Sequence, residues 1–150
     1  MKLIRSLALA VVLTLSFMTI PAMAANDSGI AINTVEPIAG GPGTFTTVGI
    51  ANNGSPFCLA GIVESTTNTT TVRGKTVTLY RKTFNCSDGS GSFVLDVSAG
   101  SRPSRPSSWT VVGGTGQFTA LWGSGSSTTS TDLSTSASKL GTLTGNFHFR

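Results

Sequence analysis

Short runs of alternating apolar and polar residues, separated by clusters of Gly, Ser, Asn and Pro, make up most of this 150-residue chain. Alternation with a period of two places successive side chains on opposite faces of a β-strand, and the turn residues mark where strands end. After residue 24, no stretch has the apolar period of an amphipathic helix. The pattern therefore predicts an all-β fold of antiparallel strands.

Seven segments have the length and composition of strands, and a weaker eighth lies near Ile30–Val35. The seven are Thr44–Ala51, Phe57–Ser65, Lys75–Cys86, Gly91–Ala99, Ser108–Val112, Gln117–Ser124 and Leu140–Phe149. Such regular spacing favours an antiparallel seven- to eight-stranded barrel, with a β-sandwich as the alternative.

Alternation also indicates which side chains share a face of their strand. Four such groups are Phe93, Leu95 and Val97; Trp109 and Val111; Phe118, Ala120 and Trp122; and Leu143, Gly145, Phe147 and Phe149. The opposite faces of most strands are polar. We therefore expect one packed face and one face toward water or a lumen.

The first 24 residues have the parts of a secretory signal peptide. Lys2 and Arg5 form a basic start, an apolar-rich run covers residues 7–20, and Ala22-Met23-Ala24 fits the small-residue cleavage pattern. The alternative is an uncleaved anchor, but the run is shorter than the roughly 20 apolar residues that a membrane span needs. We expect cleavage between Ala24 and Ala25, a single barrel domain over 25–150, and export to the periplasm or the medium.

Removal of the signal peptide changes the charge of the chain. The full sequence carries a formal net charge of +4, and loss of Lys2 and Arg5 leaves +2. So small a charge does not indicate nucleic-acid binding. No second apolar run of comparable length follows, so no integral membrane segment is predicted in the mature chain, and the oligomeric state is left open.

The two cysteines, Cys58 and Cys86, would reach an oxidising compartment, where a disulfide is the default and two separate thiols are the alternative. The bridge would close a loop of about 29 residues, worth about 3–4 kcal/mol in the chain-entropy model. With two cysteines and one histidine, the chain lacks the ligands of a zinc site. We predict no metal and no cofactor.

Residues 124–138 consist almost entirely of Ser, Thr and Gly. A segment of this composition buries little apolar surface, so we interpret it as a flexible loop.

The stretch from Trp109 to Phe118, with Gly113, Gly114 and Gly116 before the phenylalanine, resembles the glycine hairpin of dirigent proteins and of bacterial relatives of the allene oxide cyclase barrel. The segment 82–93, with a Cys-x-Asp-Gly-x-Gly pattern, also resembles exported bacterial members of that group. The resemblance covers about residues 75–125 and implies an eight-stranded antiparallel barrel with a central cavity. It transfers the barrel, because the polar motifs of the enzymes do not map onto this chain.

Four residues in strand segments are candidates for ligand binding: Glu64, Tyr80, Arg81 and Asp96. A carboxyl group in an apolar lumen would have a raised pKa, Arg81 would hold a carboxylate, and Tyr80 would donate a hydrogen bond. Tyr80 and Arg81 are adjacent, so at most one of them points inward in a regular strand. The alternative is that these side chains face solvent and protect sheet edges.

Three functions remain open from the sequence. The first is an exported barrel that binds a small apolar or aromatic molecule without catalysis. The second is a cyclase- or dirigent-type enzyme that shapes a reactive intermediate between convergent polar groups in the lumen. The third is a structural or surface-interaction protein with a filled interior. The absence of a catalytic motif favours a protein that is not an enzyme.

Overall fold

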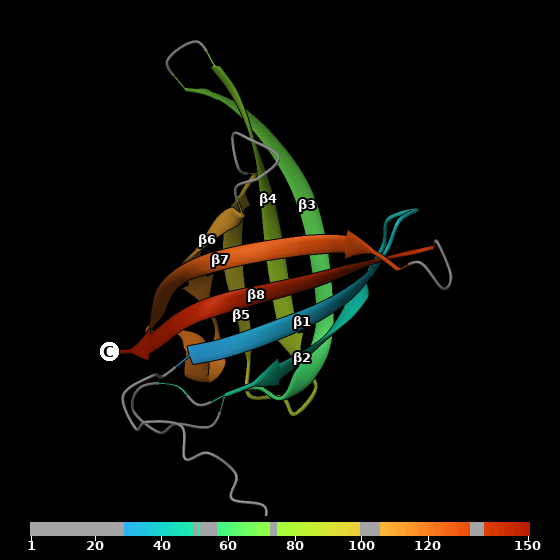
Figure 1. Ribbon diagram of the computed structural model, residues 1–150. Coiled ribbons are helices and arrows are strands. Elements are labelled where there is room, and N and C mark those ends of the chain that lie inside the picture. The colour runs from blue at the N-terminus through green and yellow to red at the C-terminus, as the bar shows by residue number, and fades with distance from the viewer. Residues whose placement is uncertain (1–28, 50, 52–56, 73–74, 100–105, 133–136) are drawn as a thin grey trace, which may run out of the picture.

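The fold is an eight-stranded antiparallel barrel, seen in a computed structural model that describes residues 29–49, 51, 57–72, 75–99, 106–132 and 137–150 (Figure 1). The strands are β1 (Gly29–Pro37), β2 (Gly43–Val48), β3 (Ala60–Val72), β4 (Lys75–Cys86), β5 (Ser92–Ser98), β6 (Ser107–Gly114), β7 (Leu121–Thr131) and β8 (Ser138–Phe149). A single turn of 3₁₀-helix, η1 (Gly116–Phe118), lies between β6 and β7. The predicted all-β barrel is confirmed, and the sandwich alternative is not adopted.

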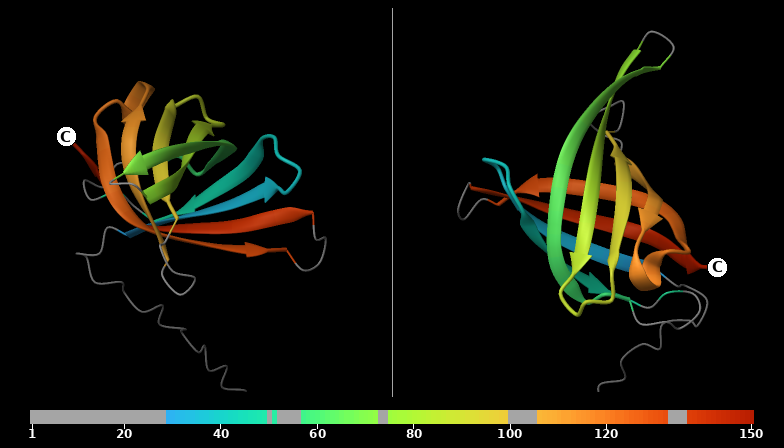
Figure 2. Two further views of the ribbon diagram at one scale, coloured as in Figure 1. Left: turned by 90° about the horizontal axis from the view of Figure 1, so that it is seen from above. Right: turned by 180° about the vertical axis from the view of Figure 1, so that it is seen from behind.

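Each strand pairs with the next along the chain, and β8 closes the barrel by pairing with β1. Closure places Ile32 opposite Leu143, although the two are far apart in the sequence. Strands β7, β8 and β1 cross in front of β3, β4 and β5, and the long β3–β4 hairpin extends past the rest of the barrel (Figures 1 and 2). Full closure removes the exposed edges that an open sheet would have.

Aromatic side chains fill the middle of the barrel. Seven of them among the described residues are less than 5% exposed: Phe45, Phe57, Phe84, Phe93, Trp109, Phe118 and Phe147. The rings of Phe84 and Phe93 stack with centroids 4.7 Å apart, and Phe57 contacts Phe93 and Phe147. Ring pairs in these geometries add to the burial energy, so the aromatic side chains contribute stability beyond the apolar area that they bury.

Trp109 lies at the other side of this cluster. Its indole stacks on Phe147 with a centroid distance of 4.7 Å, and its Nε1–H donates to the carbonyl oxygen of Ser126 at 2.9 Å. The expected inward faces of Phe93, Leu95 and Val97 and of Trp109 and Val111 are confirmed, since all five are buried or pack against the core.

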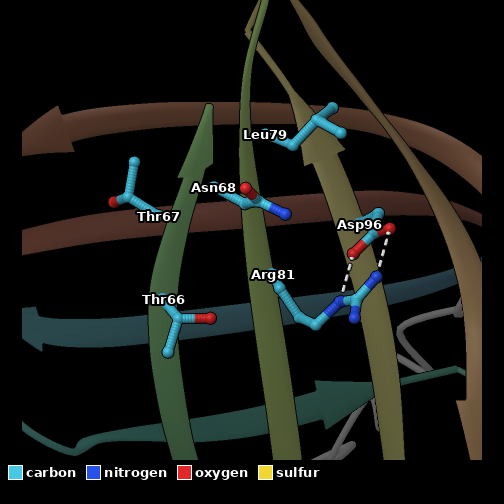
Figure 3. Close-up of a pocket in the computed structure, with 6 residues that line it drawn as sticks. All are labelled: Thr66, Thr67, Asn68, Leu79, Arg81 and Asp96. Atoms are coloured by element: carbon cyan, nitrogen blue, oxygen red, sulfur yellow. Dashed lines mark hydrogen bonds and ion pairs between the residues drawn. The ribbon is translucent and has the colours of Figure 1, made fainter. Parts of the chain in front are cut away.

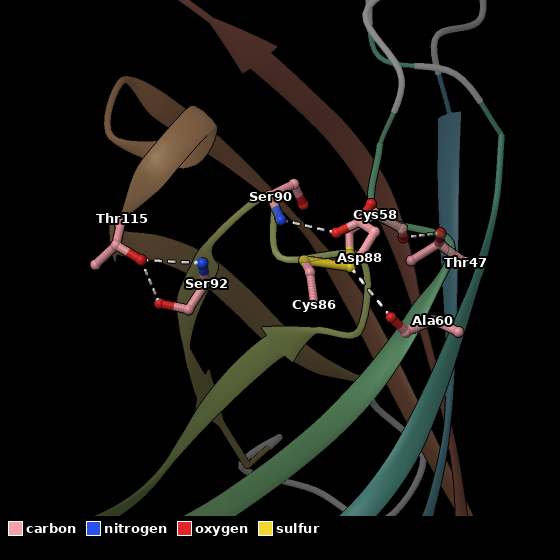
Figure 4. Close-up of a disulfide and its surroundings, with 8 residues drawn as sticks. All are labelled: Thr47, Cys58, Ala60, Cys86, Asp88, Ser90, Ser92 and Thr115. Atoms are coloured by element: carbon pink, nitrogen blue, oxygen red, sulfur yellow. Dashed lines mark hydrogen bonds between the residues drawn. A yellow bond between two sulfur atoms is a disulfide. The ribbon is translucent and has the colours of Figure 1, made fainter.

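Cys58 and Cys86 form a disulfide near the start of β3 and the end of β4 (Figure 4). Their Cα atoms are 5.7 Å apart, within the usual range for such a bridge. Nearby, the hydroxyl of Thr47 donates to the Cys58 carbonyl oxygen, which joins β2 to the segment that carries the bridge. The predicted disulfide is therefore confirmed.

The glycine-rich connection after β6 differs from the expected strand over Gln117–Ser124. Gly116 has φ +58°, in the left-handed region, and a Cβ there would meet the Ser90 carbonyl oxygen. Residues 116–118 form η1, and Phe118 turns into the core with 0% exposure. The 3₁₀ turn shifts the alternation by one residue, so Leu121 is buried and Trp122 points outward. The prediction that Ala120 and Trp122 share the buried face of Phe118 is wrong, since both are exposed.

The connection is held to β5 by paired contacts. The Thr115 N–H donates to the Ser92 carbonyl oxygen at 2.7 Å, and the Ser92 N–H donates to the Thr115 hydroxyl at 3.0 Å (Figure 4). The predicted structural hairpin of Gly113, Gly114, Gly116 and Phe118 thus contains a helical turn rather than a direct strand reversal.

The interpretation of residues 124–138 as a flexible loop is wrong for 124–131, which continue β7. Strand β7 pairs with β8 over its whole length and with β6 over 124–127. Backbone hydrogen bonds with β8 along the whole segment, and with β6 over 124–127, hold it without apolar side chains, since every residue contributes a donor and an acceptor. Residues 133–136 lie outside the described residues.

The predicted signal peptide, residues 1–24, also lies outside the described residues. Within the part of the chain that is described, no helix is long and apolar enough to cross a membrane.

Candidate functional site

A charged and hydroxyl-rich cluster lies on the inner face of the barrel. Glu36 of β1 accepts hydrogen bonds from Lys82 of β4, from Ser65 of β3 and, at 3.1 Å, from Thr34 of β1. The Lys82 Nζ also donates to Ser65 Oγ at 3.0 Å. The side chains of Glu36 and Lys82 are each 15% exposed. We call these four residues the inner polar cluster.

The alternation of two strands explains why these charges face inward. In β1, Glu36 follows Ile30, Ile32 and Thr34 at intervals of two, and those three are at most 2% exposed. In β4, Lys82 lies two residues before Phe84, which is fully buried. Glu36 and Lys82 are therefore in phase with the core.

The electrostatics favour an ionised Glu36. Burial by itself raises its pKa, but the hydrogen bonds from Lys82 and Ser65, attraction to the Lys82 ammonium and the hydrogen bond from Thr34 outweigh burial, and the net pKa is lowered. A carboxylate and an ammonium thus share a partly dehydrated site, where their interaction is stronger than on an open surface.

The surroundings of the cluster combine apolar surface with restricted space. Lys82 is opposite Leu95 across β4 and β5, and the next inward pair, Tyr80 and Val97, lies farther along the same strands. Leu95 and Val97 are buried, whereas Tyr80 is 41% exposed. A Cβ at Gly43 would lie 2.8 Å from Cγ of Glu36, so a glycine there leaves room for the carboxylate side chain. The arrangement presents a charged pair beside an apolar and aromatic wall.

Three of the four predicted site residues lie on the outer face instead. Arg81 and Asp96 are opposite each other across β4 and β5 and form a two-bond ion pair, with Nε–Oδ1 at 2.7 Å and Nη2–Oδ2 at 2.8 Å. Glu64 is exposed and out of phase with the buried Val63. The expectation that these three side chains line the lumen is wrong, because Phe84, Phe93 and Leu95 take the inward positions of their strands. Tyr80 alone of the four follows the inner face.

Sequence reasoning missed Glu36 and Lys82, although a signal was present. Lys82 is adjacent to the predicted Arg81, and the phase of β4 decides which of the two side chains faces inward. Counting by twos back from Phe84 reaches Lys82 and Tyr80, and counting forward from Ile30 and Ile32 reaches Glu36. A charged residue in phase with apolar neighbours is the signal for an inward-facing charge.

The sulfur atoms of Cys58 and Cys86 lie close to a carboxylate oxygen of Asp88, so three atoms of types that can bind a metal ion are grouped here. The two sulfurs are bonded to each other, so neither is a thiolate ligand. Asp88 instead accepts a hydrogen bond from the Ser90 N–H at 2.9 Å and shapes the turn between β4 and β5 (Figure 4). We assign this cluster a structural role.

Comparison with known proteins gives no relative of this chain: no protein-family model matches it, and searches of curated proteins and of solved structures also give no match. The arguments for function therefore rest on the geometry of the chain itself.

Proposed function

We propose that this chain is an exported binding protein that holds a small amphipathic molecule at the inner polar cluster. The observation that carries the proposal is the pair of Glu36 and Lys82, which are part-buried charges on the inner face of a barrel whose core consists mainly of aromatic and aliphatic side chains. Charges in such positions cost desolvation energy, and a hydrophobic pair of similar volume would often be as stable. A role in recognition accounts for charges at this place.

The class of ligand follows from what surrounds the cluster. The side chain of Tyr80 is 41% exposed and offers an aromatic contact surface, and Lys82 and Glu36 offer a donor and an acceptor. A molecule with an apolar or aromatic body and one polar head group fits both. The rings of Phe84, Phe93 and their neighbours fill the middle of the barrel. The ligand would therefore lie beside the inner polar cluster rather than deep in the interior.

The resemblance to the allene oxide cyclase and dirigent barrels is part of the proposal. Its support is the closed ring of eight antiparallel strands, together with the tight glycine connection before Phe118. Binding is preferred over catalysis because Glu64, Arg81 and Asp96, the polar groups that would have to converge in the lumen of an enzyme, lie on the outer face.

Export is supported by the Cys58–Cys86 disulfide, since such bridges persist in oxidising compartments. It is tested by N-terminal sequencing of the protein after expression in a bacterial host. Ala25 at the new N-terminus is the expected result, and an intact Met1 on the folded protein would contradict it.

Ligand binding is tested with 1-anilinonaphthalene-8-sulfonate, which has an aromatic body and an anionic head, followed by displacement with decanoate, cinnamate, indole and decylamine. We expect saturable fluorescence, displacement by at least one competitor, and roughly tenfold or greater weakening in Lys82→Met, as for loss of a hydrogen bond to a charged group. Arg150→Met, which removes an exposed cation at the C-terminus, is the matched control.

Near-UV circular dichroism must show that Lys82→Met keeps its tertiary packing. Binding that is equal in wild type and Lys82→Met, or the absence of saturable binding by any of these probes, would contradict the proposal.

A further inference from the structure

A depression of about 280 Å³ lies over the outer face of β3, β4 and β5, away from the inner polar cluster (Figure 3). Its lining residues are Thr66, Thr67, Asn68, Leu79, Arg81 and Asp96. The register of the three strands brings these residues together: Thr66 is opposite Arg81, and Arg81 is opposite Asp96, in one row across the strands. Asn68 and Leu79 are opposite each other in the next row. We propose that this depression binds one ring of a neutral oligosaccharide.

The charge of the depression argues against an anionic ligand. Asp96 already engages Arg81 through two hydrogen bonds, and these hold the pKa of the Asp96 carboxyl below its usual value despite partial burial. The pair is therefore ionised and neutral as a unit. A carboxylate or phosphate ligand would have to displace Asp96 from a two-bond contact with Arg81.

The pair nevertheless keeps hydrogen-bonding capacity. A guanidinium has five N–H donors, and two of those of Arg81 point at Asp96. A carboxylate offers about four acceptor sites, so Asp96 can accept further bonds. The exposed ion pair contributes little to folding stability. The main consequence of the ion pair is that it fixes a hydrogen-bond donor, Arg81, beside an acceptor, Asp96, on the surface.

Neighbouring side chains complete a pattern that suits a sugar ring. The hydroxyls of a sugar each donate and accept, and so do the hydroxyl of Thr66 and the amide of Asn68, both exposed. Leu79 supplies an apolar patch for the C–H groups of the ring. The volume is just below the range of about 300–1,000 Å³ that holds drug-sized ligands, which fits a single ring.

The rows of outward side chains continue beyond the depression. Next to Leu79 in its row is Ser98, whose hydroxyl is 2.7 Å from that of Ser108 on β6. Next to Asp96 in its row is Thr110. These hydroxyls would contact the following ring of a chain, so we expect an oligosaccharide to bind more tightly than a single sugar.

The test is an NMR titration of the isotopically labelled mature chain with four neutral probes: cellohexaose, maltohexaose, laminarihexaose and chitohexaose. We expect at least one of them to shift the Asn68 side-chain amide, the Arg81 Nε–H and the Leu79 methyl signals together and saturably. Oligogalacturonate, which carries carboxylates, is the anionic comparison and should leave these signals in place.

Two variants connect the shifts to the depression. Asn68→Leu and Thr66→Val should each weaken binding roughly tenfold, as for one or two lost hydrogen bonds. Thr46→Val, on the outward face of β2, is the matched control and should leave affinity unchanged.

The inference is overturned if none of the neutral probes shifts these signals, if the shifts map to another face, or if Asn68→Leu binds as wild type does. Tighter binding of oligogalacturonate than of every neutral probe would also overturn it. Because the depression and the inner polar cluster lie on opposite faces of the sheet, this result does not depend on the small-molecule proposal.

Discussion

The indole of Trp109 lies directly over the backbone of Gly145: a Cβ at Gly145 would be 2.5 Å from Cζ2 of the ring. Gly125, opposite Gly145 across β7 and β8, makes the same approach, with a Cβ 2.6 Å from the same atom. Two paired glycines thus form the slot that holds the largest fully buried side chain of the described core. The slot explains why strands so rich in glycine still pack tightly.

Gly145→Ala should destabilise the fold by about 1–3 kcal/mol, because the added methyl group meets both the indole and the backbone of β7. Urea denaturation followed by tryptophan fluorescence measures the loss. Gly113→Ala is the matched control, since nothing lies within 4 Å of a Cβ at that position. Equal stability of the two variants would show that the slot is not tight.

Stability should fall in acid partly through Glu36. Its folded pKa lies below the unfolded value, so its contribution is complete above the unfolded pKa and is lost as the pH falls through the folded pKa. Glu36→Gln should therefore lose less stability than wild type between pH 5 and pH 3, as followed by urea denaturation at each pH. Glu64→Gln, at an exposed outward position, is the control and should keep the wild-type slope.

A double-mutant cycle should show that Glu36 and Lys82 act as a pair. Lys82→Met should cost about 2 kcal/mol, because it leaves a part-buried carboxylate without its cation. The double variant Glu36→Gln/Lys82→Met should recover part of that loss, since no charge then remains unpaired. Losses that simply add would show that the two side chains do not interact.

Removal of the disulfide should lower stability by about 3–4 kcal/mol, as expected for cysteines 28 positions apart in sequence. Thermal and urea unfolding of Cys58→Ser/Cys86→Ser, compared with the oxidised wild type, measures the change. Addition of a reductant should destabilise the wild type and leave the double variant unaffected. A reductant effect on the double variant would indicate a cause other than the bridge.

The sequence by itself determined the fold class, the approximate positions of most strands, the disulfide and the inward faces of β5, β6 and β8. These features depend on a period of two and on turn residues, which are local properties of the chain. Phe93, Trp109 and Phe147 are therefore identifiable as core residues from the alternation within their own strands.

Only the tertiary structure decided which inward-facing charges meet and where alternation is interrupted. Alternation from Phe84 places Lys82 inward, but its partner Glu36 is 46 positions away, and the closed barrel brings the two together. The turn at η1 places Trp122 on the outside, where its ring stacks on that of His148 with the ring centroids 4.3 Å apart. Residues 124–131 form a strand because β8, and over 124–127 also β6, supply their hydrogen-bond partners. Such outcomes require contacts between distant parts of the chain, which local patterns do not contain.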